Sequence, residues 1–504
     1  MPETLVQSSS NYTRYDAYLS RLRYARVPLN NQAGSSLTFG NTSTGLAEFK
    51  IPARKVHNIG QSLLSYSYTL ANAAAGTYVC SFENNQDFAS WAYLGNSSGM
   101  GLCDLNYADM YTSMIMPLRH SHQDMETRDP SNTLYLPQNG NYNQSNVANN
   151  FTPFSIDGQL NAANLASTQG IYINPPSPLD PQYVCASPLA APLTRNRMLP
   201  LSVFKDTAIG MNKNMVYPED MYLRFNTQIT AKMGFTEVQA TGVQTAYSAA
   251  VTVSNIYLFL ALEENKILVD SLLSELDKGF TLSIPYTYPY RYSGSSAASQ
   301  NVSITITKQN GRLLKRLLYG PFNGANNQQG ATAFDRSNAQ GAKISTIQSS
   351  IDARPLTDYA LNCVDPNFVI QGTSNMVIPP SCGFTATTSP FGDDWREMSK
   401  YCFGSCISNY RSYQANWFYA DVFGLQGSLK SLNQLVDDSN IEDGFILNSD
   451  HIYSIQMNCP AIVTASSNCG TGNVNTGIII HYIFALYERD IHISNAGIQF
   501  VASR

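Results

Sequence analysis

The residues best suited to chemistry in this 504-residue sequence are small groups of His, Cys and acidic side chains. Residues 119–122 (RHSH) would place two imidazoles on one face of a strand with Asp124 in phase, an arrangement that can hold a metal ion. An exposed polar loop explains these residues equally well. Cys402 and Cys406 lie close in sequence, but no second pair of ligands follows at the spacing of a zinc site. We therefore predict no metal site.

Motifs for phosphate binding and for covalent catalysis are absent from the sequence. Residues 324–330 (GANNQQG) are rich in glycine, but the lysine that a phosphate-binding loop needs does not follow. Residues 403–406 (FGSC) lack the frame of a nucleophile elbow. Glu263, Glu264 and Glu488 resemble the paired carboxylates of a glycoside hydrolase only in type, because each follows an apolar strand, where solvated acids are expected. The sequence therefore predicts no catalytic residue, no cofactor site and no enzymatic activity.

The histidines are scattered along the chain. His57, His451, His481 and His492 have no neighbouring ligand in sequence, and His481 lies in an apolar segment. We expect His481 to be a hydrogen-bonded core residue rather than a ligand. The sequence has only 3 Trp, so a sugar-binding platform of stacked indoles has little support.

The elements that organise the chain lie near its midpoint. Residues 251–262 (VTVSNIYLFLAL) are β-branched, aromatic and apolar on both alternating faces, which predicts a strand covered on both sides. A helix is expected from Glu263 to Gly279, with its acids in the first turn and Lys278 in the last. A new strand is expected at residues 280–285. The apolar face of the helix consists of Leu268, Val269, Leu272, Leu273 and Leu276.

Both flanks of this helix recur elsewhere in the sequence. The pattern Ala-Leu-x-Glu-x-x-Ile begins at Ala261 and again at Ala485, and residues 49–52 (FKIP) resemble residues 282–285 (LSIP). The two echoes have similar offsets and bracket the helix. They indicate a tandem duplication of one unit.

Composition favours β-structure and argues against several classes of partner. Only 13% of the residues are charged, whereas Tyr is abundant at 31 and the net charge is −5. A nucleic-acid coat built on basic arms is therefore not expected, and neither is direct sequence-specific binding of nucleic acid. We also expect no secretory signal and no transmembrane helix, since the longest strongly apolar run, residues 478–487, is shorter than the ~20 residues that span a bilayer. The nine cysteines are expected to be free thiols.

We predict an all-β chain of two tandem β-sandwiches with long loop insertions and a short connecting helix. Residues 1–34 form an N-terminal arm, in which residues 15–26 are expected to form a helix that docks on a neighbour, on an anionic surface or on its own domain. Residues 35–264 form the first sandwich with a large insertion at about 71–199, residues 265–279 the connecting helix, and residues 280–504 the second sandwich. Further strands are expected at 37–39, 47–51, 62–70, 221–229, 302–307, 312–319, 343–349, 368–371, 416–423, 452–457 and 478–486, and a helical turn at 395–401.

The order of these segments resembles that of the double jelly-roll major capsid proteins, in particular those of virophages and polinton-like viruses. The resemblance covers residues 35–504 and is carried by residues 49–52 leading into 61–64, by 105–109 (LNYAD), by 252–265 and by 478–491. It implies two tandem jelly rolls and no enzyme. It also implies a homotrimer that forms a nearly six-sided capsomer and tiles the icosahedral shell of a DNA virus.

The same resemblance implies further partners and a location. Neighbouring capsomers, penton proteins and minor or cement capsid proteins would contact the trimer, and residues 1–34 would be placed to contact an internal membrane. The protein would assemble inside the host cell and reside in the virion. Two other readings remain open: a carbohydrate-binding or carbohydrate-active β-sandwich protein, which needs an aromatic cleft with facing carboxylates or a calcium cage, and a surface adhesin or spike.

Overall fold

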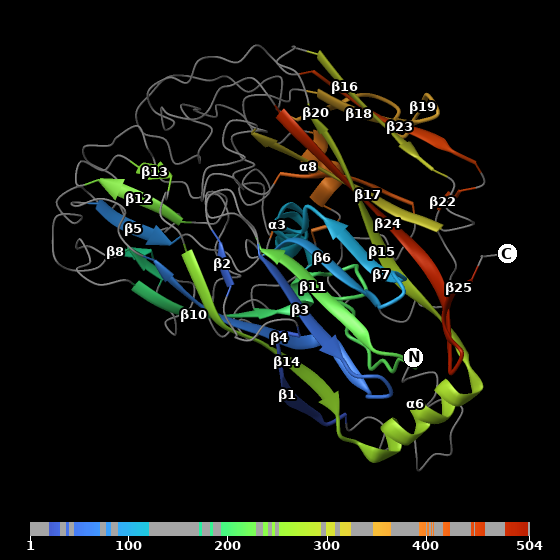
Figure 1. Ribbon diagram of the computed structural model, residues 1–504. Coiled ribbons are helices and arrows are strands. Elements are labelled where there is room, and N and C mark those ends of the chain that lie inside the picture. Colours follow the sequence, from blue (N-terminus) through green and yellow to red (C-terminus); the bar gives the residue numbers. More distant parts are fainter. Residues whose placement is uncertain are drawn as a thin grey trace.

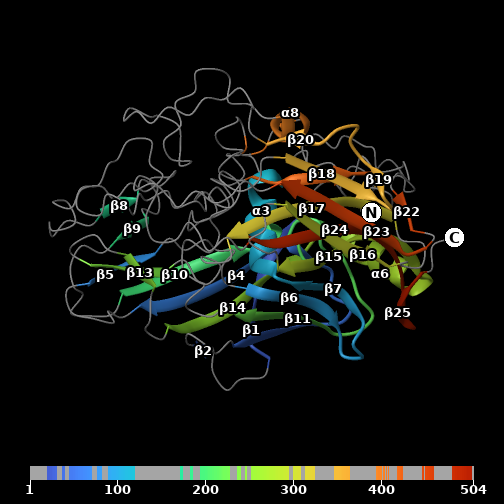
Figure 2. The ribbon, with the colours of Figure 1, turned by 90° about the horizontal axis from the view of Figure 1, so that it is seen from above.

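The part of the chain that the computed structural model describes consists mostly of strands in antiparallel sheets (Figures 1 and 2). The larger blocks that it describes are residues 20–30, 45–70, 89–119, 193–227, 251–293, 299–307, 313–323, 346–363, 449–458 and 479–501. The shorter ones are residues 37–39, 77–81, 171–173, 182–184, 235–239, 244–246, 393–399, 401–402, 405, 407, 417–423 and 445–447. The expected strand at 368–371 lies outside the described residues.

The first half of the chain contributes two facing sheets. One has the order β1 (Leu22–Pro28), β14 (Val251–Glu263), β4 (His57–Leu70) and β10 (Leu193–Pro200), with β2 (Leu37–Phe39) also paired to β14. The other has the order β3 (Leu46–Ile51), β11 (Met221–Thr227), β6 (Ala89–Asn96) and β7 (Gly101–Asn106). Their inner faces share a core that includes Phe49, Leu64, Leu223 and Leu258, all fully buried.

The second half of the chain builds the same arrangement. One sheet has the order β15 (Phe280–Ser293), β24 (Ile479–Ser494), β17 (Leu313–Asn323) and β21 (Tyr419–Val422), with β22 (Phe445–Ile446) on β17 and β25 (Gly497–Phe500) on β24. The other has the order β16 (Ser299–Ile306), β23 (His451–Asn458), β18 (Thr346–Ile351) and β19 (Arg354–Pro355), with β20 (Leu361–Asn362) also on β18.

The strand order is identical in the two halves. If the eight principal strands of each half are numbered along the chain, the sheets read 1-8-3-6 and 2-7-4-5 both times. In the first half these are β1, β3, β4, β6, β7, β10, β11 and β14; in the second they are β15, β16, β17, β18, the β19–β20 pair, β21, β23 and β24. Eight antiparallel strands wound into two such sheets form a jelly roll. The predicted all-β fold of two tandem jelly rolls is therefore confirmed.

The helix between the two rolls was predicted correctly except at its start. Helix α6 (Lys266–Lys278) buries Leu268, Leu272 and Leu276 and ends at Gly279, whose φ of 81° suits glycine. The expected start at Glu263 is wrong, because β14 continues through this residue. Asn265 caps the helix instead, its side chain accepting a hydrogen bond from the Ile267 amide at 3.0 Å.

The expected helix at residues 15–26 is wrong where the structure describes it. Residues 22–28 form strand β1, which pairs with β14 from Leu22↔Glu263 to Pro28↔Tyr257. Ladder hydrogen bonds to a long central strand outweigh a weak helical pattern with an apolar residue every three or four positions. The predicted boundary at residue 35 thus assigns the first strand of the first jelly roll to the N-terminal arm. We propose that this roll begins at or before Leu22.

The expected insertion at about 71–199 is also wrong in part. It contains β6, β7 and β10, which are principal strands of the first jelly roll, and helix α3 (Ala108–Arg119). Helix α3 lacks the usual periodicity because it is covered on all sides: every described side chain of α3 is buried. The remaining elements of this region and its surroundings are β8 (Ile171–Ile173), β9 (Gln182–Val184), β5 (Thr77–Ser81), β12 (Phe235–Gln239), β13 (Gln244–Ala246) and the 3-10 turn η3 (Leu201–Val203).

The two sequence echoes have different outcomes. Ala261 and Ala485 lie on β14 and β24, which are the eighth strands of the two rolls. Residues 49–52 begin in β3, the second strand of its roll, whereas residues 282–285 belong to β15, a first strand. The repeat is therefore present in the topology, and only one of the two sequence similarities corresponds to equivalent strands.

Candidate functional site

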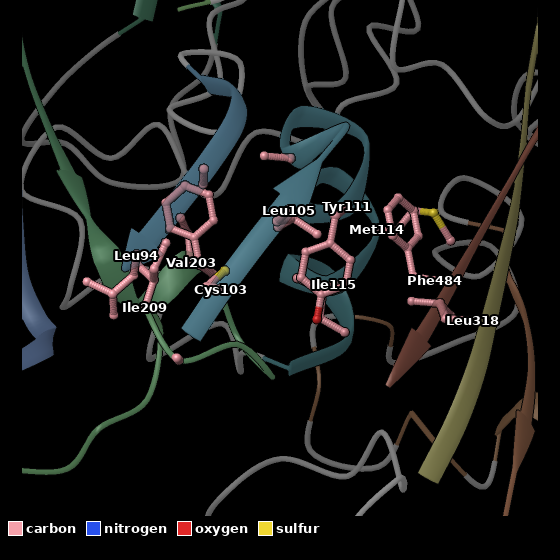
Figure 3. Close-up of a cluster of buried hydrophobic side chains, with 14 of the residues drawn as sticks. Leu94, Cys103, Leu105, Tyr111, Met114, Ile115, Val203, Ile209, Leu318 and Phe484 are labelled. Atoms are coloured by element: carbon pink, nitrogen blue, oxygen red, sulfur yellow. The ribbon is translucent and has the colours of Figure 1, made fainter. Parts of the chain in front are cut away.

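Helix α3 joins the two jelly rolls at a buried junction. It follows β7 and lies between the β3-β11-β6-β7 sheet of the first roll and the β15-β24-β17-β21 sheet of the second (Figure 2). The Tyr111 ring lies 5.0 Å from that of Phe484, and the Tyr107 ring 5.3 Å from that of Tyr482. Figure 3 shows Tyr111 and Met114 pointing from α3 toward Phe484 and Leu318. The junction therefore has the aromatic and aliphatic packing of a protein core.

A glycine allows the two rolls to approach this closely. A Cβ atom at Gly320 on β17 would lie 2.4 Å from both Cε and Sδ of Met114. Met114 is fully buried, so any larger residue at position 320 displaces the Met114 side chain or the helix. The junction is thus shaped for these two side chains.

Charged residues at the same junction form a triad across the two rolls. Asp206 accepts hydrogen bonds from Arg119 of α3 at 3.1 Å and from Arg316 of β17 at 2.8 Å. Both arginine side chains are buried. Burial alone would raise the pKa of the Asp206 carboxyl, but the two guanidinium groups outweigh it and hold the pKa below its ordinary value of 3.8. The Thr287 hydroxyl adds a hydrogen bond to the Asp206 carbonyl oxygen at 2.7 Å.

The edge of the junction is held by two further arginines. Arg489 donates to the Gly101 carbonyl oxygen at 3.0 Å, and its guanidinium lies 4.0 Å from the ring centroids of both Tyr286 and Phe500. Arg54 donates to Asp277 at 3.0 Å and to Asn495 at 2.7 Å. These contacts tie strand β7 and the β3–β4 turn to the second roll and to helix α6.

The outer sheets of the two rolls lie at opposite ends of the layer order. Figure 1 shows the layers in sequence from the bottom to the upper right: the β1-β14-β4-β10 sheet, the β3-β11-β6-β7 sheet, α3, the β15-β24-β17-β21 sheet and the β16-β23-β18 sheet. The 2-7-4-5 sheet of the first roll therefore faces the 1-8-3-6 sheet of the second. This is a head-to-tail contact between like units.

The outer face of the first sheet carries an apolar surface. We call it the head face and define it by Tyr24, Arg26, Leu63, Tyr257 and Phe259. Strand pairing places Phe259 between Arg26 and Leu63, and the Arg26 guanidinium lies 3.5 Å from the Tyr257 ring centroid. Tyr24 is 49% exposed. Its counterpart in the second roll is the sheet face that α3 covers.

The opposite end of the layer order also exposes apolar side chains. Ile452 on β23, Leu356 and Tyr359 are exposed, and Arg396 of helix α8 (Asp393–Ser399) donates to the Tyr359 hydroxyl at 2.6 Å. We call Leu356, Tyr359 and Ile452 the tail face. Helix α8 lies between the fifth and sixth strands of the second roll, the place that α3 has in the first.

The acidic residues considered for glycoside hydrolysis do not form a pair. Glu263 accepts hydrogen bonds from the Ser20 hydroxyl at 2.5 Å, the Arg21 amide at 2.8 Å and Asn214 at 2.8 Å. Although burial acts to raise the pKa of Glu263, these hydrogen bonds lower it below its ordinary value. Glu264 forms an exposed ion pair with Arg23, and Glu488 pairs with the buried Lys315 at 2.7 Å. Each carboxylate thus has a local structural partner.

The histidines and cysteines also have structural roles where they are described. The Tyr319 hydroxyl and His481 Nδ1 form a hydrogen bond of 2.8 Å, and burial lowers the pKa of His481 to about 4, which agrees with a core histidine. Burial likewise lowers the pKa of His57 to about 4 and raises that of the Cys402 thiol to about 12. His451 contacts Asp352, and His492 contacts Thr281.

Several of the considered groups lie outside the described residues: the two histidines of 119–122, Asp124, Cys406 and residues 324–330. Within the described part of the chain, no three His, Cys, Asp or Glu residues gather in a way that could hold a metal ion. No helix in that part is long and apolar enough to cross a membrane. The junction triad was not recognised from the sequence, because Arg119, Asp206 and Arg316 are far apart along the chain and have no shared motif.

Comparison with known proteins gives structural similarities only. No family model matches the sequence, and no curated protein matches it. The fold is similar to the PBCV-1 virus capsid (TM-score 0.47, 11% identity, covering 96% of this chain and 97% of that one). It is also similar to the Sputnik virophage structure (TM-score 0.46, 10% identity, 95% and 88%) and to the mavirus major capsid protein (TM-score 0.42, 9% identity, 94% and 90%).

Proposed function

We propose that this chain is a viral major capsid protein that assembles as a homotrimer. The observation that carries the proposal is the repeated 1-8-3-6 and 2-7-4-5 strand order in two rolls that meet head to tail through α3. Head-to-tail contacts between like units form a closed ring when the rotation between successive units closes. Two rolls per chain and three chains would give six similar units in such a ring.

The head and tail faces support this mode of assembly. In the second roll, the sheet face equivalent to the head face is covered by α3, with Tyr111 and Met114 against Phe484 and Leu318. On the head face, Tyr24 and Arg26 are exposed, and Leu63 and Phe259 are only partly buried. We propose that the tail face and α8 of the next chain cover it. This contact would repeat the internal junction between chains.

Such a trimer would present a nearly six-sided outline, which is the shape that tiles an icosahedral shell. Neighbouring capsomers, penton proteins and minor or cement proteins would be its partners, and the virion shell its location. The N-terminal arm before Ser20 would be the segment available for contact with an internal membrane. The modest acidic charge of −5 favours protein contacts over direct condensation of nucleic acid.

The proposal is tested by the mass of the purified protein in solution and by one surface variant. Wild type should have three times the 55.4 kDa mass of the chain at micromolar concentration. Phe259→Arg places a charge in the middle of the head face and should give folded monomers with an unchanged melting temperature. Lys278→Ala, on the exposed side of α6, is the matched control and should remain trimeric. A wild-type protein that stays monomeric would overturn the proposal.

A further inference from the structure

A buried carboxylate ties the two sheets of the second jelly roll together. Asp421 on β21 accepts hydrogen bonds from the Ser349 hydroxyl at 3.0 Å and from the Tyr453 hydroxyl at 2.6 Å. Ser349 also forms a hydrogen bond of 2.9 Å with the Tyr419 hydroxyl. Ser349 and Tyr453 belong to β18 and β23 of the opposite sheet. The carboxylate therefore bridges the core rather than lying on one face of it.

The surroundings of this carboxylate contain hydroxyl groups but no cation among the described residues. Asp421 is buried, and Ser349 and Tyr453 are fully buried. On the neighbouring strand β17, Lys315 pairs with Glu488 and Arg316 pairs with Asp206.

Other titratable groups around the tie are also uncharged or already paired. The pKa of Tyr419 is raised mainly by burial, and the nearby Cys363 thiol, close to β20, also acts to raise it. Helix α8 packs against β21 and contributes Asp394, which accepts a hydrogen bond from the Trp417 indole at 2.7 Å. No described group facing the tie supplies a positive charge to Asp421.

The pKa of Asp421 is shifted in the opposite direction to that of Asp206, which has two arginine partners. Burial without a cation raises the pKa of Asp421 from 3.8 to about 6, although its three hydroxyl neighbours act to lower it. Between these two pH values the folded state binds a proton that the unfolded state does not. The contribution of Asp421 to stability is therefore fully present in acid and is lost as the pH rises through this range.

We propose that Asp421 is a proton-controlled tie whose contribution to the stability of the second jelly roll is larger in mild acid than at neutral pH. When protonated, the carboxyl group is neutral and matches the apolar core around it. When ionised, a buried charge is balanced by hydroxyl dipoles alone, so the strands that carry Ser349, Asp421 and Tyr453 open more often. Asp421 thus makes the second roll respond to pH differently from the first, whereas the junction responds only to stronger acid.

The test is hydrogen exchange of the full-length protein at pH 5.0 and pH 7.5, corrected for the intrinsic pH dependence of exchange. His57 in the first roll and His481 in the second both act in the opposite sense, since burial lowers the pKa of each to about 4. Relative to the first roll, peptides from β18, β21 and β23 should therefore open about 10-fold more at pH 7.5, as follows from the pKa difference of Asp421. Peptides from β6 and β11 of the first roll are the internal reference and should show no such increase. If the ratio of opening at pH 7.5 to opening at pH 5.0 is the same in both rolls, the proposal is overturned.

Two variants separate the tie from a general effect of pH. Asp421→Asn should abolish the increase, because the amide does not titrate. Tyr453→Phe keeps the carboxyl group but removes a hydrogen bond to its ionised form, so the opening transition should move to higher pH. If Asp421→Asn does not fold, Tyr453→Phe decides alone. An Asp421→Asn protein with the wild-type pH response, or a Tyr453→Phe protein with an unmoved transition, would contradict the tie.

Discussion

Asp206 of the first jelly roll and Arg316 of the second meet at 2.8 Å in a buried junction, and Arg119 completes the contact from α3. The pair belongs to segments that are far apart in sequence and on different rolls. It sets the two rolls in a fixed relation while the aromatic contacts of α3 fill the space beside it.

Removal of the carboxylate at this junction should be costly. Asp206→Asn leaves two buried guanidinium groups without a counter-charge, and such a loss typically costs about 3–5 kcal/mol. Chemical denaturation monitored by circular dichroism measures the change. Glu264→Gln, which breaks the exposed pair with Arg23, is the matched control and should change stability by less than about 1 kcal/mol. Similar effects of the two variants would show that the junction triad is not a stabilising contact.

The same triad predicts sensitivity to strong acid. The pKa of Asp206 is held below 3.8 in the folded state, so its contribution to stability is fully present above the pKa of the unfolded state and is lost as the pH falls through the folded-state value. We expect unfolding to become easier below about pH 4, with the junction peptides of α3 and β17 exchanging first. In Asp206→Asn this acid-dependent step should be smaller. An unchanged step would assign it to other carboxyl groups.

The close approach at Gly320 predicts a suppressor. Gly320→Ala should destabilise the protein, because the new Cβ atom would lie 2.4 Å from Met114 Sδ. Met114→Ala alone should cost about 2–5 kcal/mol through the cavity that it leaves. The double variant should be less destabilised than the sum of the two singles, by about 0.5–3 kcal/mol. Strict additivity in the double-mutant cycle would mean that the two residues do not share this space.

Glu263 should anchor the start of the first strand. Its carboxylate holds Ser20 and the Arg21 amide, and Glu263→Ala removes both contacts together with that to Asn214. We expect faster hydrogen exchange in β1 and little change in β17 of the second roll. Glu275→Ala on the surface of α6 serves as the control. Unaltered protection of β1 would show that strand pairing with β14 is sufficient without this anchor.

The segments with clear periodicity could be predicted from the sequence. Residues 251–262 and 280–285 are strands as expected, and the leucines of α6 define its buried face. In each of these elements the local pattern of apolar residues shows which faces are buried. Helix α3 could not be predicted in this way. Residues such as Met110, Thr112 and Met114 are all buried, so the helix has no polar face to mark its period.

The site itself was beyond what sequence patterns can reveal. Arg119 was noted only as part of a possible metal-binding segment, and Asp206 and Arg316 carry no motif. Their contact depends on the packing of one roll against the other, which is a long-range property. The strand at residues 22–28 was mistaken for a helix for a similar reason, since its partner β14 lies more than two hundred residues later.

The central claim, that like rolls meet head to tail within and between chains, is tested most directly by electron microscopy of the purified protein. We predict particles of three chains whose averaged top view has six similar lobes and a nearly hexagonal outline. Two-lobed monomers, or dimers related by a twofold axis through like faces, would contradict it.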